Sequence, residues 1–267
     1  MLRKIAKIIH NPRKYLARAL RLALWKISAL WGDKSFFLQA QMDIAPSSLW
    51  YNKEFVGKFG GFFINKDVIK REIAPWRQPW DTVRRDMIIL LLRSLTERSV
   101  PGAFAEFGVY KGETAKLIHH YCPERKLYLY DTFSGFGDRM VASERKHTGE
   151  TIPRSGFSDT SEKQVVDFIS ATNDNIIYVI GYFPESITGE MGQENFAFVH
   201  LDADLFDSMS SGLRWFYPRM NKGGIILMHD FNAWHGARTA IEEFFCDKPE
   251  TIIPMPDKSG SALIVRL

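Results

Sequence analysis

The feature that most constrains the fold is a repeated alternation, after residue 100, of short apolar segments with longer amphipathic ones. Strands are expected at 103–108, 126–131, 175–183, 196–203, 223–231, 251–255 and 262–267. Helices are expected at 82–99, 113–122, 160–171, 207–220 and 236–246. Apolar strands that alternate with helices need cover on both faces, so the pattern predicts an α/β fold with a mostly parallel seven-stranded sheet and helices on both sides.

Two helix starts carry capping signals. Asp81 stands directly before the apolar run "TVRRDMIILLLRSLTERS" and is expected to cap that helix. Asp159 and Glu162 have the spacing of a capping box for the helix at 160–171. The polar stretch 134–158, which directly precedes the second of these helices, is expected to be an insertion that closes over a substrate.

The length of 267 residues, with 45% hydrophobic residues, fits one large domain with an extension better than two equal domains. We expect a basic amphipathic helical extension at 1–32, an irregular or helical cover segment at 33–80 and the main domain at 81–267. The two cysteines, Cys122 and Cys246, provide no disulfide framework, which favours a reducing, cytoplasmic compartment. No apolar run reaches the ~18 residues of a membrane span.

The net charge of +4 is concentrated at the N-terminus. Eight basic residues and no acidic one precede Asp33: Arg3, Lys4, Lys7, Arg13, Lys14, Arg18, Arg21 and Lys26. The remaining chain is slightly acidic, so a nucleic-acid partner is not expected. Residues 1–31 could lie on an anionic membrane surface, at the inner face of the membrane, or could pack on the protein itself or on a second subunit. The sequence leaves open whether the chain forms a homo-oligomer.

Acidic residues gather where the expected strands end. Ligands of open α/β sheets bind beyond the carboxyl ends of the strands, which makes these positions candidates for a site. The residues at these strand ends are Glu106, Gly108, Asp131, Asp202, Asp204, His229 and Asp230, and five of the seven are acids.

The first strand-to-helix turn, "EFGVYKGET", has glycines at 108 and 112 and an acid, Asp131, at the end of the next strand. Glycine allows close approach of a ligand, and an acid at that position can bind ribose hydroxyls, so the pair indicates a nucleoside pocket. The turn is neither G-x-G-x-x-G nor a P-loop. Asp131 as a simple cap before Thr132 is the alternative.

Asp202, His229 and Asp230 are expected at the tips of adjacent strands, where they could surround a divalent cation. The oxygen ligands favour Mg²⁺, and the histidine shifts the preference slightly toward Mn²⁺. A hydrogen-bonded Asp202–His229 pair without metal is the alternative.

The segments "AEFGVYKGETAKLI", "YLYDTFSGFG", "IGYFPESI" and "FVHLDADLFDSMSSGLRWFYPRMNKGGIILMHDF" together resemble the macrocin O-methyltransferase family. The resemblance runs from about residue 80 to the C-terminus. It implies a Rossmann-like class I methyltransferase fold, S-adenosylmethionine as cofactor, a divalent metal, and methylation of a hydroxyl on a sugar or glycosylated small molecule. A surface or lipid-linked glycan would suit the cationic N-terminal segment.

The resemblance also implies roles for particular residues. The cofactor-binding residues would be Glu106, Phe107, Gly108, Gly112, Thr114, Asp131, Thr132 and Phe133. Asp202 and Asp230 would hold the metal, and Asp204 would be the catalytic base. His229 is a candidate third ligand, with a weaker or metal-free site as the alternatives. The family commonly has two adjacent acids where this chain has His229 and Asp230.

Other residues have weaker signals. His147 and Arg154, in the insertion, are candidate substrate contacts. His119, His120 and His200 are expected to be structural, and His235 is undecided. Two rival functions stay open: a metal-dependent glycosyltransferase, because "DAD" is a D-x-D triplet, and a non-catalytic scaffold with the methyltransferase fold.

Overall fold

The computed structural model describes residues 81–267, except 154, 172 and 173. The expected extension at 1–32 with its membrane contact, the cover segment at 33–80 and the substrate contact Arg154 therefore lie outside the described residues. The domain boundary at residue 81 stays a prediction.

Within the described part, no helix has the length and apolar character needed to cross a membrane.

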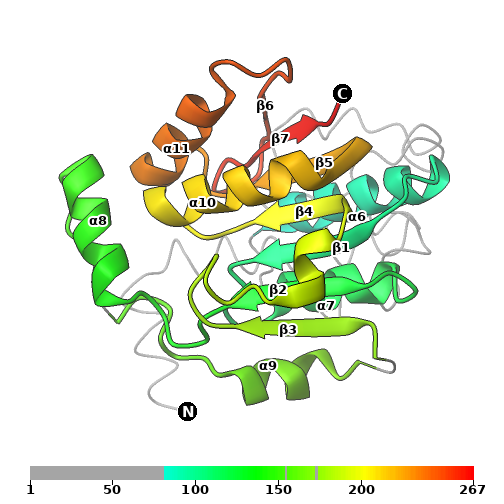
Figure 1. The fold of residues 1–267 in the computed structure, drawn as a ribbon, viewed down its shortest axis with the longest axis horizontal. Helices are drawn as coiled ribbons and strands as arrows, with labels where there is room; N and C mark the ends of the chain where they lie inside the picture. The colour runs from blue at the N-terminus through cyan, green and yellow to red at the C-terminus, as the bar shows by residue number, and fades with distance from the viewer. Residues whose placement is uncertain (1–80, 154, 172–173) are drawn as a thin grey trace, which may run out of the picture. The chain divides into compact units, whose positions relative to one another are not determined.

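Helices and strands alternate along the described chain in the expected order (Figure 1). The helices are α6 (Thr82–Glu97), α7 (Glu113–Tyr121), α8 (Asp138–Thr148), α9 (Glu162–Ile169), α10 (Phe206–Phe216) and α11 (His235–Phe245). The strands are β1 (Ala103–Phe107), β2 (Leu127–Asp131), β3 (Ile176–Ile180), β4 (Phe196–Leu201), β5 (Met220–Met228), β6 (Ile253–Pro254) and β7 (Ala262–Val265). Two short 3₁₀ helices, Gly189–Gln193 and Tyr217–Arg219, precede β4 and β5.

The seven strands form one sheet in the order β3-β2-β1-β4-β5-β7-β6. Neighbours from β3 to β5 pair in parallel, while β7 is antiparallel to both β5 and β6. The strand order reverses direction between β1 and β4, which is where open α/β sheets bind their ligands. The predicted fold class, a mostly parallel seven-stranded sheet with helices on both faces, is confirmed.

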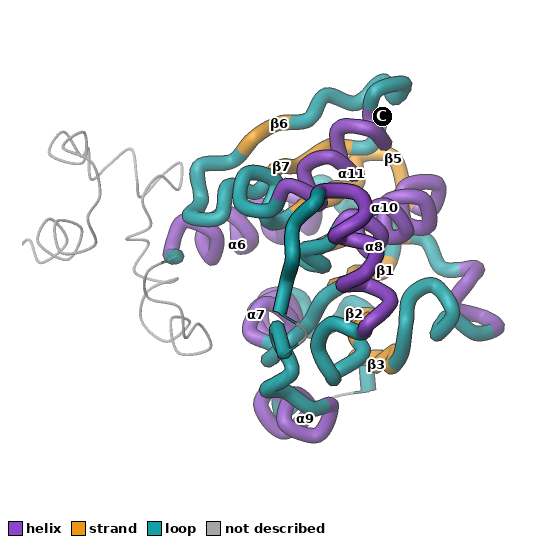
Figure 2. The backbone as a smooth tube through the Cα atoms, turned by 90° about the vertical axis from the view of Figure 1, so that its left-hand side faces the viewer, coloured by secondary structure: helices purple, strands orange, loops and turns teal. Residues whose placement is uncertain are grey.

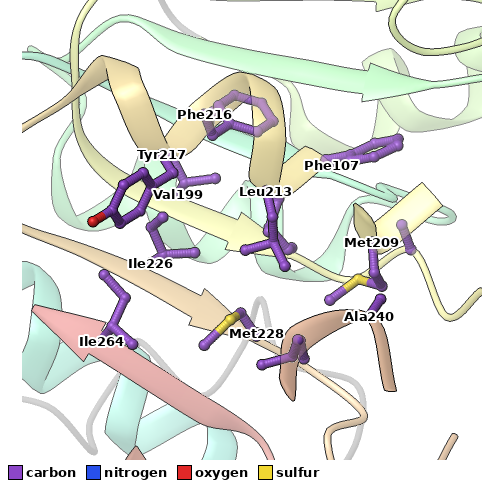
Figure 3. Close-up of a cluster of buried hydrophobic side chains, with 14 of the residues drawn as sticks. Phe107, Val199, Met209, Leu213, Phe216, Tyr217, Ile226, Met228, Ala240 and Ile264 are labelled. Carbon is purple, nitrogen blue, oxygen red and sulfur yellow. The ribbon is translucent and has the colours of Figure 1, made fainter. Parts of the chain in front are cut away.

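The main apolar core lies between the sheet and the pair α10–α11 (Figure 3). Val199 of β4, Ile226 of β5 and Ile264 of β7 contribute to it from the sheet, and Leu213 of α10 and Ala240 of α11 from the helices. Helices α6 and α7 pack against the other face, and α9 packs against α7. Because strand side chains alternate between faces, every second residue of β1 and β4 is directed toward α6 and α7.

Two local expectations need correction, and a third is confirmed. Ser161, not Asp159, caps α9, and its hydroxyl accepts the Gln164 N–H at 3.3 Å. Asp159 instead pairs with Lys111. Strand β5 begins at Met220 and ends at Met228, so His229 and Asp230 follow the strand rather than end it. Asp81 caps α6 as predicted, by accepting the Arg84 N–H at 3.3 Å.

The insertion at 134–158 contains a helix, α8, that the sequence reading did not expect. Its segment "DRMVASERKHT" carries no apolar stripe, so periodicity gave no signal. Tertiary contacts supply its support: α8 packs on α10 and α11, and the buried Glu144 accepts the Phe206 N–H at 2.8 Å.

Strands β1 and β4 come close together just beyond their ends. Gly108 has φ +88°, and a Cβ there would lie 1.9 Å from the backbone carbonyl oxygen of Asp202. Only glycine combines the backbone conformation with the absence of a side chain that this contact requires. This contact fixes the position of Asp202 relative to the turn that follows β1.

We expect Gly108→Ala to lower the free energy of unfolding by about 3 kcal/mol, because overpacking and an unfavourable φ add together. Urea denaturation would measure the change. Gly192→Ala is the matched control, since a Cβ at Gly192 meets nothing within 4 Å. Equal stability of the two variants would contradict the close contact.

Candidate active site

A cavity of about 460 Å³ opens at the carboxyl ends of the parallel strands. Its size falls within the usual range for small-molecule pockets. The loops after β1, β2, β3 and β4 line it, together with α8 and the start of α10. In Figure 1, α8 lies on the side to which the arrowheads of β2, β3 and β4 point, and Figure 2 shows α8 beside α10 from that side.

One end of the cavity is formed by the glycine turn after β1 and by Asp131. Asp131 Oδ2 accepts the backbone N–H groups of Val109 and Tyr110 at 2.7 and 2.9 Å. Its Oδ1 accepts the Phe133 N–H at 2.7 Å. A carboxylate has about four lone-pair sites, so Asp131 holds the turn in shape and keeps capacity for a ligand hydroxyl.

A cluster of ionisable side chains lies beyond the tips of β4 and β5. His229 Nδ1 is 2.7 Å from Asp202 Oδ1 and 2.8 Å from Asp230 Oδ2. Burial alone would lower the pKa of His229, but the charge of Asp202 and the contacts with both carboxylates raise it to about 9. Asp202 and Asp204 also line the cavity, so the cluster adjoins the ligand space.

Arg84, from the first turn of α6, supplies the fixed positive charge of this cluster. Its Nη2 donates to Asp202 Oδ2 at 2.5 Å and to Thr114 Oγ1 at 3.3 Å. Arg84 is only 6% exposed. Burial would raise the pKa of Asp202, but His229 and Arg84 hold it well below its usual value. Asp202 is therefore an anion fixed from two sides.

The pKa of Asp204 is shifted in the opposite direction from that of Asp202. Burial raises its pKa well above the usual value, and the carboxylates of Asp202 and Asp230 raise it further. Asp204 and Asp230 both have positive φ, 55° and 59°, which is uncommon for residues other than glycine. Strained backbone of this kind often occurs at functional sites, because the surrounding structure must hold it in place.

Glu106 and His200 form a second buried pair, on neighbouring positions of β1 and β4. His200 Nδ1 lies 3.0 Å from Glu106 Oε1. Burial raises the pKa of Glu106 well above normal and lowers that of His200 to about 3. Burial therefore favours the neutral form of both side chains.

Comparison with known proteins identifies the family. The profile of "Macrocin-O-methyltransferase (TylF)" matches residues 83–255, more than half of the chain. The chain belongs to the macrocin O-methyltransferase family. The resemblance drawn from the strand-end motifs is thereby confirmed.

Individual relatives are more distant. The chain is 24% identical over 175 residues to 8-demethyl-8-(2,3-dimethoxy-alpha-L-rhamnosyl)-tetracenomycin-C 4'-O-methyltransferase of Streptomyces olivaceus. It is 22% identical over 161 residues to demethyldecarbamoylnovobiocin O-methyltransferase of Streptomyces niveus. These alignments cover 60% and 55% of this chain and span 64% and 59% of the relatives' length.

The O-methyltransferase NovP shares the fold, with a TM-score of 0.59 at 22% identity over 68% of this chain and 79% of that chain.

The family implies a divalent cation, and the donor set fits one. Among the described residues, ligand atoms of Asp202, His229 and Asp230 lie within 4.8 Å of one another. His229 Nδ1 is buried and lies 2.7 Å from an oxygen of Asp202 and 2.8 Å from an oxygen of Asp230. A ring nitrogen so close to two carboxylate oxygens suits a set of ligands for a shared cation. The salt bridge with Arg84 engages Asp202 Oδ2 and leaves Oδ1 facing His229.

The predicted cofactor-binding residues separate into two groups. Phe107, Gly108, Asp131 and Thr132 line the cavity. The other four are not among its lining residues: Glu106, Gly112, Thr114 and Phe133. In that second group, Glu106 pairs with His200, a Cβ on Gly112 would meet Val165 of α9, and Thr114 contacts Arg84. Contact with a cofactor stays a prediction for all eight.

The remaining histidines occupy varied positions. His147 of α8 lines the cavity and stacks on Phe206, with ring centroids 4.1 Å apart. His119 and His200 are buried, while His120 and His235 are exposed. Among the histidines that the structure describes, only His147 lines the cavity.

Sequence reading missed Arg84, although a signal was present. Arg84 occupies the same helical stripe as Ile88, Leu92 and Leu95, all of which are fully buried. A charged residue on an apolar stripe needs a buried partner. The cavity wall from α10, including Ser208, had no comparable signal.

We expect Arg84→Met to lower the free energy of unfolding by about 3 kcal/mol or more, because it leaves Asp202 buried without its partner. Adding Asp202→Asn should restore part of the loss, since the unpaired charge disappears. A double-mutant cycle by urea denaturation measures the coupling. Additive losses in the double variant would show that the pair is not energetically coupled.

Proposed function

We propose that this protein is an S-adenosylmethionine-dependent O-methyltransferase that methylates a hydroxyl of a sugar or glycosylated small molecule. The observation that carries the proposal is a single cavity lined both by Asp131 and the Gly108 turn and by Asp202 and Asp204. The family supports the reaction type, and the relatives' names supply sugar and glycosylated natural-product acceptors. A surface or lipid-linked glycan remains a narrower proposal.

The nucleoside end of the cavity would bind the cofactor. The Asp131 carboxylate is held by three backbone N–H groups and can accept a further hydrogen bond from a ribose hydroxyl. Phe107 and Thr132 line the same end. S-adenosylmethionine carries a methyl group on a sulfonium, which is a good leaving group. The protein's main tasks are therefore to align the acceptor oxygen and to remove its proton, and alignment alone can contribute ~7–11 kcal/mol.

Asp202, His229 and Asp230 would hold the divalent cation, for which the oxygen ligands favour Mg²⁺. A bound cation lowers the pKa of a hydroxyl that coordinates it. Asp204 would accept the proton of that hydroxyl as general base. Burial and the carboxylates of Asp202 and Asp230 raise the pKa of Asp204, which favours its protonated form. Positive charge at the neighbouring ligands restores its capacity to act as a base.

The acceptor would enter along α8 and α10. His147 and Met140 of α8 and Ser208 of α10 line this part of the cavity. The sulfur of the cofactor, the acceptor oxygen and Asp204 would then lie along one cavity. The cytoplasmic location and any membrane contact of residues 1–31 also remain proposals.

Binding of S-adenosylhomocysteine tests the proposal and separates it from its rivals. Calorimetry should show binding to the full chain, weakened about 10- to 100-fold in Asp131→Ala by loss of hydrogen bonds to a charged group. Asp167→Asn, an exposed acid of α9, is the control. Binding of a UDP-sugar in its place would support a glycosyltransferase, and binding of neither ligand would support a scaffold.

Methyl transfer from labelled cofactor to a panel of glycans and glycosylated small molecules tests the chemistry. Excess chelator should stop turnover, and added Mg²⁺ should not rescue Asp202→Ala. Asp204→Asn should lower kcat by about 10²- to 10⁴-fold and leave S-adenosylhomocysteine binding unchanged. Full activity in excess chelator would rule out the metal, and full activity of Asp204→Asn would rule out the base.

A further inference from the structure

His229 lies between two pairs of carboxylates. On one side, its Nδ1 is close to Asp202 and Asp230. On another, a ring nitrogen of His229 and carboxylate oxygens of Asp81 and Asp257 all lie within 4.8 Å of one another. Nε2 is buried and has no hydrogen-bond partner within the described part of the chain. Because Nδ1 is adjacent to the first pair, Nε2 is the nitrogen available to the second.

Asp81 and Asp257 come from distant parts of the chain and are fixed independently. Asp81 caps α6 and accepts the Arg84 and Lys258 N–H groups at 3.3 and 3.4 Å. Asp257, in the loop between β6 and β7, accepts the Ser261 N–H at 2.7 Å and its hydroxyl at 2.8 Å. Asp81, Asp257 and His229 are exposed by only 4%, 6% and 6%. The group is a built, buried arrangement and not a chance meeting of surface acids.

We propose that Asp81 and Asp257 are positioning residues for His229, which donates its Nε2–H to them through one buried water. This fixes the proton on Nε2 and leaves the lone pair of Nδ1 facing Asp202 and Asp230. The inference rests on the cation site of the proposed function. Histidines that bind metals usually donate their other ring N–H to a carboxylate, a carbonyl or a water, which sets the ring orientation and the tautomer.

A water fits the gap better than a second cation does. The ligand atoms of Asp81, His229 and Asp257 lie within 4.8 Å of one another, and Nε2 makes no direct hydrogen bond among the described residues, so the group suits a single bridging water with several polar partners. Both Asp257 oxygens already accept hydrogen bonds from Ser261, and one Asp81 oxygen accepts two from the backbone. Their remaining lone pairs suffice for a water but make a poor ligand set for a metal ion.

This arrangement explains how a histidine can act as a metal ligand at position 229. A carboxylate would present an oxygen lone pair in either orientation, whereas an imidazole presents one only if the proton is kept on the far nitrogen. Asp81, at the N-terminus of α6, and Asp257, in the β6–β7 loop, would therefore act on the site through His229. Neither Asp81 nor Asp257 lines the cavity.

The tautomer of His229 is the direct test. Side-chain ¹⁵N NMR of the full chain saturated with Mg²⁺ should show His229 protonated on Nε2 alone, with His229→Gln used to assign the signal. Asp81→Asn and Asp257→Asn should each shift His229 toward a mixture of tautomers. A proton on Nδ1 in the Mg²⁺-bound protein, or an unchanged tautomer in both variants, would overturn the proposal.

Affinity for Mn²⁺ is the second test, measured by calorimetry and by the EPR signal of free Mn²⁺. Asp81→Asn and Asp257→Asn should each weaken Mn²⁺ binding about 10- to 100-fold, as found for partners of metal-binding histidines. Asparagine keeps the shape of the side chain, and at position 81 it can still cap α6. At position 257 it gives up one of the two oxygens that accept from Ser261, so binding of S-adenosylhomocysteine serves as the check that each variant is folded. Asp167→Asn should have wild-type affinity, and all variants should bind S-adenosylhomocysteine as the wild type does.

The outcomes separate the two proposals. Wild-type protein that binds S-adenosylhomocysteine but no Mn²⁺ or Mg²⁺ would refute the cation site of the proposed function. Normal Mn²⁺ affinity in both variants would refute only the positioning role. Two Mn²⁺ ions per chain would show that the group of Asp81, His229 and Asp257 takes a cation itself, and would overturn the bridging water.

Discussion

The balance of buried charge beyond β4 and β5 is the interaction on which the site depends. Three carboxylates, Asp202, Asp204 and Asp230, meet where the sheet turns into loops, and such a group repels itself in a low dielectric. Arg84 offsets part of that charge from α6, through a short salt bridge with Asp202. His229 lies within the group and gains a raised pKa from it. A divalent cation would add the positive charge that an ionised Asp204 needs beside Asp202 and Asp230.

The close contact of β1 with β4 makes this arrangement possible. Gly108 packs against the carbonyl of Asp202, so the turn that would hold the cofactor and the acid that would hold the cation share one backbone contact. Asp131 then fixes the same turn from β2 through the N–H groups of Val109 and Tyr110. The parts of the cavity proposed for cofactor and acceptor would thus be set by adjacent strands, which suits a transfer that requires alignment of two reactants.

Helix α8 lines the part of the cavity that is proposed to bind the acceptor. Its sequence is polar, but the buried Glu144 accepts an N–H at the start of α10, where a helix favours negative charge. Burial raises the pKa of Glu144 despite that bond. A Cβ on Gly236 of α11 would collide with the same carboxylate. The segment expected to be a closing insertion is, in this part, a helix held against the body of the protein.

The sequence by itself determined the fold class, the order of strands and helices, and the concentration of acids at strand ends. Hydrophobic periodicity and the position of strand ends are local properties that can be read from the sequence. For that reason the sequence alone could indicate candidate site residues at Asp131, Asp202, Asp204, His229 and Asp230. Tertiary structure decided which of them meet, and it added partners from elsewhere. Arg84 and Glu144 lie 118 and 62 residues from their partners, Asp202 and Phe206. Asp81 and Asp257 lie 148 and 28 residues from His229, the side chain that we propose they position. No local pattern encodes such pairings, because the favourable energy of a buried charge or hydrogen bond exists only once the sheet has brought distant segments together and excluded water.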